Sequence, residues 1–161
     1  MSSTFRSNPS DECAVSALDA HLGYWLRAVS NHVSHAFKCK VEAHGVTVAE
    51  WVVLRALYDV DAIKPSELAN KLGLTRGAIS KLVDRLVLKE LVFVRDDRSD
   101  GRAQPLRLRS AGRALVPTLA ALADQNDEET FCHLSAEQRT VLSETLALLV
   151  ARLGLRGSPT E

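Results

Sequence analysis

The sequence predicts a mainly α-helical fold with one small β-hairpin, an α+β arrangement of about six helices. Apolar residues recur at three- and four-residue steps along most of the chain, which is typical of amphipathic helices. Two short stretches on either side of position 100 depart from this period: Leu91–Val94 is a β-type run and Leu106–Leu108 alternates, as is typical of strands. The length of 161 residues fits one domain, 1–161, with enough chain for a proper core.

A long first helix is predicted from about Ala14 to Ala43, behind a polar N-terminal tail. Gly45 is suited to end it, because glycine adopts a left-handed backbone at little cost. Thr47 and Glu50 form a capping box that begins a second helix, which ends near Asp59. Apolar residues keep the helical step along the first helix: Leu18, Leu22, Leu26, Val29, Val33 and Phe37.

The next two helices form a helix-turn-helix signature. Pro65 suits the first position of a short third helix, because its missing N–H is no loss there. Gly73 ends that helix after Leu72, and Thr75 caps a fourth helix that continues to about Lys89. Two helices joined by a short glycine-containing turn, the second of them basic, are typical of DNA-binding proteins.

The fourth helix has one apolar and one polar face. Short side chains near its N-terminus would let the helix backbone come close to the bases of a DNA major groove, and its arginines could reach base edges or phosphates. An ordinary amphipathic helix with a solvated basic face would show the same pattern. The fourth helix alone therefore does not distinguish a DNA-binding helix from an ordinary surface helix. The polar face carries Arg76, Gly77, Ser80, Lys81, Asp84 and Arg85.

A β-hairpin, or wing, is predicted after this helix. Leu91–Val94 and Leu106–Leu108 have β-type patterns, and the loop between them is too charged to be buried. Arginine at a narrow loop tip suits a minor groove and its flanking phosphates. Six arginines cluster around the wing: Arg95, Arg98, Arg102, Arg107, Arg109 and Arg113.

Two further helices complete the chain. The fifth is predicted from about Ser110 to His133. Ser135 and Gln138 form a second capping box, which begins a final helix with apolar residues through Leu153.

The charge distribution favours a nucleic-acid partner, although the net charge is zero. Residues 64–113 hold twelve Lys or Arg and six Asp or Glu, so this span carries +6 and the remainder −6. A basic middle between acidic ends is expected of a DNA-binding module on a separate scaffold.

Other classes of protein are less well supported. The chain lacks the GxSxG, Walker, HExxH and GxGxxG motifs, so neither an enzyme nor a cofactor is expected. No signal peptide and no membrane-length apolar run are apparent, and Cys13, Cys39 and Cys132 are far apart. We therefore expect a cytoplasmic protein with reduced thiols and no membrane partner.

Over about residues 18–153 the chain resembles the MarR (multiple antibiotic resistance regulator) family of winged helix-turn-helix regulators. The resemblance rests on the order and spacing of a long first helix, Pro65–Leu74, the fourth helix, Leu91–Arg95, the wing Asp97–Ala103 and Leu106–Arg113. The family's wing element Asp-x-Arg is matched by Asp100 and Arg102, whereas Gly101 stands where a second arginine is common.

The resemblance implies a homodimeric DNA-binding transcriptional regulator, of the repressor kind, on a pseudo-palindromic operator. Residues 12–46 and 114–155 would dimerise, and residues 47–113 would form the DNA-binding lobe. Asp100 would orient an arginine, and Ser66 would hold a phosphate. The implied DNA-contacting residues are Ser66, Thr75, Arg76, Gly77, Ser80, Lys81, Arg85, Arg95, Arg98, Ser99, Asp100 and Arg102.

The resemblance also implies a small-molecule effector, often an aromatic or phenolic anion, bound between the dimer helices and the DNA-binding lobe. The candidate ligand-binding residues are His21, Tyr24, Trp25, Trp51 and Arg55. Plain core packing is the alternative for the two tryptophans.

Three alternatives stay open. His32, His35 and Cys39 have ligand-type spacing on the first helix for zinc or another soft metal, or else form a polar stripe. Cys13, near that helix's N-terminus, would suit a thiol sensor. A winged-helix module that binds protein instead of DNA is the third alternative.

Overall fold

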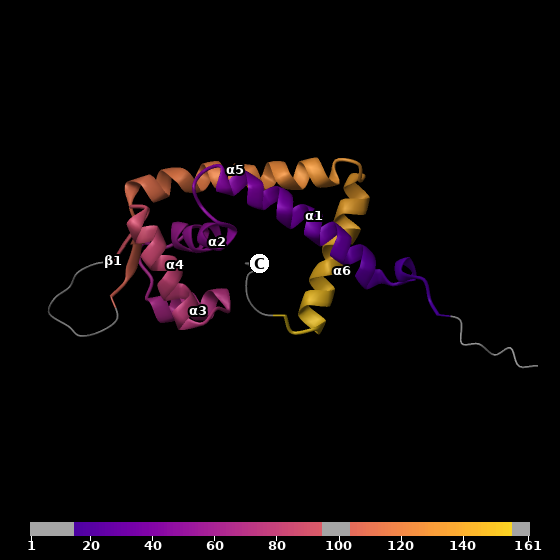
Figure 1. Ribbon diagram of the computed structural model, residues 1–161, viewed down its shortest axis with the longest axis horizontal. Coiled ribbons are helices and arrows are strands. Elements are labelled where there is room, and N and C mark those ends of the chain that lie inside the picture. Colours follow the sequence, from indigo (N-terminus) through magenta and orange to yellow (C-terminus); the bar gives the residue numbers. More distant parts are fainter. Residues whose placement is uncertain (1–14, 95–103, 156–161) are drawn as a thin grey trace, which may run out of the picture. The chain divides into compact units, whose positions relative to one another are not determined.

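Six α-helices and a two-stranded hairpin follow one another in a computed structural model that describes residues 15–94 and 104–155 (Figure 1). The chain divides into two units, Met1–His32 and Val33–Glu161, and each is described by itself. The elements are a 3₁₀ turn (Leu18–Ala20), α1 (Leu22–Glu42), α2 (Val48–Tyr58), α3 (Pro65–Leu72), α4 (Arg76–Leu88), β1 (Val92–Val94), β2 (Leu106–Leu108), α5 (Ser110–Phe131) and α6 (Ala136–Arg152).

The first unit corrects the predicted start of the long helix. Instead of beginning near Ala14, α1 begins at Leu22, because His21 is extended (φ −98°, ψ 127°) and separates the helix from the 3₁₀ turn. The Trp25 Nε1–H donates to the Asp19 carbonyl oxygen at 2.8 Å, which ties the turn to the helix. The apolar period continues through turn and helix alike, so the pattern does not reveal the break.

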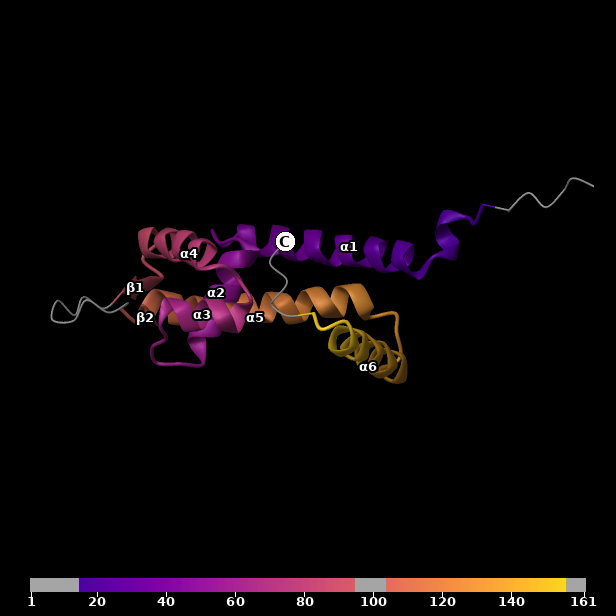
Figure 2. The ribbon, with the colours of Figure 1, turned by 90° about the horizontal axis from the view of Figure 1, so that it is seen from below.

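The second unit holds the hydrophobic core. α2 packs against α4, α5 and β2, and α3 packs against α4 (Figure 2). No residue of α6 is buried, and Val41 is the buried residue of α1. The largest fully buried apolar side chains come from α2, α3, α4, the hairpin and α5, and include Leu54, Leu57, Leu68, Ile79, Leu86, Leu106 and Leu119.

The turn between α3 and α4 forms as predicted. Gly73 has a left-handed backbone (φ 68°), and its N–H bonds to α3 carbonyls, which ends that helix. The Thr75 hydroxyl oxygen accepts the Ala78 N–H at 3.2 Å, which confirms Thr75 as the N-cap of α4. This geometry sets the direction in which α4 leaves α3.

Both predicted capping boxes are confirmed. At α2 the Thr47 N–H donates to the Glu50 carboxylate and the Glu50 N–H donates to the Thr47 hydroxyl oxygen. At α6 Ser135 and Gln138 exchange the same pair of bonds.

The hairpin is antiparallel, with Phe93 opposite Arg107 and Val94 opposite Leu106. Ile63, just before α3, adds a bridge on the other side of β2. The Leu106 N–H donates to the Ile63 carbonyl oxygen at 2.8 Å, and the Ile63 N–H returns a bond at 3.2 Å. β2 is therefore held on both sides at the base of the wing.

Gly112 marks a close approach between α5 and the residue before β1. It is buried, and a Cβ atom there would fall on the Leu91 backbone carbonyl. The Arg109 N–H also donates to that carbonyl oxygen at 2.9 Å, so the first turn of α5 lies directly against the start of the hairpin. Only a residue without a side chain fits this contact.

We expect Gly112→Ala to lower the free energy of unfolding by about 1–3 kcal/mol, because backbone atoms cannot move aside for the added methyl group. Chemical denaturation measures the change. Gly77→Ala is the matched control, since Gly77 is also helical but a Cβ atom there would meet nothing within 4 Å. Equal stability of the two variants would contradict the close approach.

Candidate nucleic-acid interface

α4 separates its residues into a buried and an exposed face. Ile79, Leu82, Val83 and Leu86 are all buried against the core. The opposite face is open along its whole length, which leaves its cations and short polar groups available to a partner. The exposed residues of this face are Arg76, Gly77, Ser80, Lys81, Asp84 and Arg85, as the sequence predicts.

The N-terminal end of this face is shallow. A Cβ atom at Gly77 would meet nothing within 4 Å, so the helix backbone there is directly accessible. Thr75 is exposed beside it, and its hydroxyl oxygen already accepts the Ala78 N–H. Ser66 is half-buried at the second residue of α3. A groove-shaped partner can therefore come close to the α4 backbone at this end.

A buried ion pair holds the C-terminal end of α4. The Lys89 ammonium donates to the Glu50 carboxylate and to the Gly45 carbonyl oxygen, each at 2.7 Å. The Glu50 side chain is fully buried, whereas that of Lys89 is 37% exposed. The contact joins α4 to the capping box of α2. Sequence reasoning missed this pair, because Glu50 was interpreted as a cap alone.

The Glu50 carboxyl stays charged despite its burial. Burial raises its pKa, but the Lys89 ammonium, the Thr47 N–H and the charge of Arg85 together outweigh burial and lower the pKa below 4.5. One carboxylate oxygen, Oε1, is buried without a hydrogen-bond partner, so the stability of the charged form depends on the contacts to the other oxygen, Oε2.

The arginines predicted around the wing have different roles. Arg113 is exposed, and its guanidinium also donates to the Tyr58 carbonyl oxygen (3.5 Å) and lies 5.3 Å from the centre of the Tyr58 ring. Arg107 is half-buried on β2, and Arg109 is exposed. The remaining predicted wing residues, Arg95, Arg98, Ser99, Asp100 and Arg102, lie outside the described residues.

A pocket of about 670 Å³ lies in the second unit, between the C-terminal half of α1, the start of α2 and α5. Trp51 lines it and also packs against the core, so its ligand and core interpretations are compatible. Arg55 does not line the pocket, and instead pairs with Asp59 at 2.6 Å. The apolar lining includes Val33, Phe37, Val48, Trp51, Val52 and Ala123.

The other three ligand candidates belong to the first unit. Tyr24 and Trp25 make an edge-to-face contact with ring centres 5.1 Å apart. Trp25 is 54% exposed, so the core-packing alternative for Trp25 is wrong. His21 is exposed in the extended link before α1.

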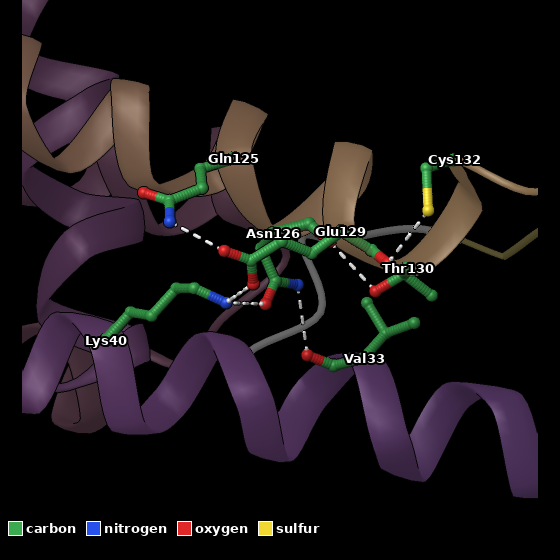
Figure 3. A network of polar contacts seen from close by, with 7 residues as sticks. All are labelled: Val33, Lys40, Gln125, Asn126, Glu129, Thr130 and Cys132. Atoms are coloured by element: carbon green, nitrogen blue, oxygen red, sulfur yellow. Dashed lines mark hydrogen bonds and ion pairs between the residues drawn. The ribbon is translucent and has the colours of Figure 1, made fainter.

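A polar network beside the pocket joins α1 to α5 (Figure 3). The Lys40 ammonium donates to the Asn126 side-chain oxygen Oδ1 at 2.9 Å and to the Glu129 carboxylate at 2.7 Å. The Asn126 amide in turn donates to the Val33 carbonyl oxygen at 3.2 Å. Asn126 is buried and also lines the pocket, so this network forms part of the pocket wall. The sequence contained no motif that would have indicated it.

The sensor alternatives find limited support. His35 Nε2 and Cys39 Sγ are 3.8 Å apart, but no group of three His, Cys, Asp or Glu side chains within residues 15–94 and 104–155 is placed to hold a metal ion. Cys39 and Cys132 are exposed free thiols, and Cys13 lies outside the described residues. None of the described helices is both long and apolar enough to cross a membrane.

Comparison with known proteins identifies likenesses to transcriptional regulators. Residues 44–103 match a model described as the MarR family. The HTH-type transcriptional regulator TtmR of Methylorubrum extorquens is 26% identical over 161 residues, which cover 100% of this chain and 78% of TtmR. The HTH-type transcriptional repressor Rv2887 of Mycobacterium tuberculosis is 28% identical over 131 residues, which cover 81% of this chain and 94% of Rv2887.

Solved structures agree with these matches. A probable transcriptional regulator from Pseudomonas aeruginosa aligns with a TM-score of 0.71 at 26% identity, covering 83% of this chain and 99% of that one. Rv2887 in complex with DNA aligns with a TM-score of 0.67 at 27% identity, covering 81% and 98%. Rv2887 in complex with salicylic acid aligns with a TM-score of 0.62 at 28% identity, covering 81% and 97%.

We expect Lys89→Met to lower the free energy of unfolding by about 2 kcal/mol at pH 7, because it leaves the buried Glu50 carboxylate without its cation. The pKa of Glu50 is lowered in the folded state, so the pair stabilises the protein above pH 4.5 and less as pH falls through the folded pKa. The difference between wild type and Lys89→Met should therefore shrink as the pH falls below 4.5.

Lys71→Met, at an exposed position on α3, is the control. A difference in free energy of unfolding between wild type and Lys89→Met that does not change with pH would contradict this role of the pair.

We expect Gly77→Ala to raise the free energy of unfolding by about 0.5–1 kcal/mol, since alanine is the better helix former and its methyl group meets no protein atom. The same variant should bind DNA more weakly, because that methyl group would occupy space that a groove needs. Denaturation and fluorescence anisotropy with labelled DNA measure the two effects. Unchanged DNA affinity would show that DNA does not come close to the α4 backbone at Gly77.

Proposed function

We propose that the chain is a winged helix-turn-helix transcriptional regulator of the MarR family, whose model residues 44–103 match. DNA binding is the activity of this class of regulator. We propose further that the chain is a homodimeric repressor that binds a pseudo-palindromic operator and is released by a small aromatic ligand.

The observation that carries the proposal is the exposed face of α4. It combines an accessible backbone at Gly77, a short polar side chain at Ser80 and cations at Arg76, Lys81 and Arg85. These groups suit a major groove, where short side chains permit approach and cations bind phosphates or guanine edges. We propose that they contact DNA together with Thr75 and with Ser66 at the start of α3.

The wing residues complete the proposed interface. Arg95, Arg98, Ser99 and Arg102 would contact phosphates or the minor groove, and Asp100 would orient an arginine. Two strands and the bridge to Ile63 hold the base of the wing, which supports this use of the loop.

Exposed apolar side chains on α6 support the homodimer. Val141, Leu148 and Leu153 are between 53% and 67% exposed, and no residue of α6 is buried. Such a surface is favourable only when another surface covers it. We propose that residues 12–46 and 114–155 form the dimer interface and that residues 47–113 form the DNA-binding lobe. Two copies of α4 would then meet DNA about one turn, roughly 34 Å, apart.

The effector site is proposed at the pocket beside Trp51. Its apolar lining and its volume suit an aromatic molecule. The structures of Rv2887 with DNA and with salicylic acid support a regulator that has both kinds of partner. A thiol- or metal-responsive regulator on the same fold, through Cys13 or through His32, His35 and Cys39, remains the alternative mode of sensing.

We expect the purified protein to protect two symmetric half-sites near its own gene in a footprinting experiment, with affinity that falls steeply as salt rises. Arg85→Gln should weaken binding and flatten the salt dependence by about one unit if Arg85 contacts a phosphate. Ser80→Ala should instead change which sequences are preferred.

Lys71→Gln is the control, because it also removes one positive charge, at an exposed position on α3 that is not among the proposed DNA contacts. A winged-helix module that binds protein would behave differently: it would show no specific footprint, and Arg85→Gln would leave its activity unchanged. A single, unpaired protected site would contradict the dimer but not the regulator.

A further inference from the structure

The pocket beside Trp51 has both aromatic and polar residues in its walls. Phe37 from α1 and Trp51 from α2 both line it and both pack against the core. An aromatic face attracts a cation through its quadrupole, and Trp is the strongest of the aromatic residues in this respect. The charges around these two rings therefore decide which ligands the pocket prefers.

The lysines near the pocket are already engaged. Lys38, which lines it, pairs with Glu42 at 3.8 Å, and Glu42 lines it too. Lys40 donates to Asn126 and Glu129 in the network of Figure 3. A neighbouring carboxylate therefore offsets the charge of each ammonium.

Asn126 offers an incoming anion at most one N–H. One N–H of its side-chain amide already donates to the Val33 carbonyl oxygen, and its side-chain oxygen Oδ1 already accepts from Lys40 (Figure 3). The residue forms a wall of the pocket while both of its polar ends are engaged in holding α1 to α5.

The helix ends at the pocket do not favour an anion either. The start of α2 carries a partial positive charge, but its Thr47–Glu50 capping box already occupies donors of the first turn and places a carboxylate there. The end of α1, at Glu42, carries the opposite partial charge and also borders the pocket. The two ends offset each other.

One carboxylate remains uncompensated. Asp127 on α5 lines the pocket and is exposed, and within the described residues it takes part in no hydrogen bond or ion pair. Arg139, whose pKa it helps to raise, is paired with Glu128 at 2.8 Å. With histidine counted as neutral, the charged lining residues are Lys38, Glu42 and Asp127, so the lining carries a net charge of −1.

We propose that this pocket binds a small aromatic cation, such as an aryl amine or an aryl quaternary ammonium, in preference to an aromatic carboxylate. Trp51 and Phe37 receive the aromatic and cationic groups, and Asp127 is the counter-charge. The inference deepens the proposed function, because it gives the charge of the effector that the regulator senses.

The test compares three probes that share a phenol ring. They are 4-hydroxyphenyltrimethylammonium, its neutral isostere 4-tert-butylphenol and the anion 4-hydroxybenzoate. Titration calorimetry on the full chain without DNA measures each affinity. We expect the cation to bind about fivefold or more tighter than the isostere, which differs from it only in charge, and the anion to bind most weakly.

Asp127→Asn should remove most of the preference for the cation and leave the affinity for 4-tert-butylphenol unchanged. Asp124→Asn is the matched control, because Asp124 is an exposed carboxylate on the same helix that does not line the pocket. Thermal unfolding of both variants checks that they fold as the wild type does.

Three results would overturn the inference: tighter binding of the anion, equal binding of cation and isostere, or equal effects of the two aspartate substitutions. Failure of all three probes to bind would overturn it as well. These results can be told apart from failure of the proposed function. The DNA footprint tests that function, and the calorimetry is done without DNA. Release of bound DNA by the cation supports both proposals, and binding without release contradicts only its role as effector.

Discussion

The packing of α4 against the start of α2 depends on one buried carboxylate. Glu50 has no exposed surface, and its Oε2 atom accepts from the Thr47 N–H and from the Lys89 ammonium, each at 2.7 Å. A charge in such a place is tolerated only when a counter-charge meets it, so the end of α4 must lie against the start of α2. Lys89 also bonds to Gly45, which brings the turn after α1 to the same point. The same contacts of Glu50 thus cap α2 and position the end of α4.

This constraint explains how α4 can leave one whole face free. Thr75 and Gly73 determine where the helix begins, Lys89 determines where it ends, and Ile79 and Leu86 seat it on the core. None of these contacts uses Arg76 or Ser80, so these residues are open to a partner without cost to the fold. The charge of Arg85, in contrast, also helps to lower the pKa of Glu50. A rigid helix with an independent surface is what sequence-specific reading of DNA requires.

A second polar cluster lies within the second unit. Lys40, Asn126 and Glu129 hold α1 to α5, and the amide that connects them is also part of a pocket wall. Because the Glu129 carboxylate already offsets the charge of Lys40, the aromatic rings and Asp127 contribute most to the character of the pocket. The same ion pairs that stabilise the helix packing therefore also determine which charges a ligand meets. The polar groups that hold α1 to α5 thus also influence which ligand the pocket prefers.

The sequence by itself determined the order of the elements, the helix-turn-helix, the capping boxes and the exposed face of α4, because local hydrogen bonds and apolar spacing control each of them. Only the tertiary structure decided which groups meet across the chain. Lys89 and Glu50 are 39 residues apart and Lys40 and Asn126 are 86 apart, so no local pattern links them. Tertiary contacts also engaged Arg113 with Tyr58 and separated Arg55 from the pocket that Trp51 lines. The start of α1 was predicted wrongly for a related reason, since Leu18 and Leu22 keep their spacing whether the backbone between them is helical or extended at His21.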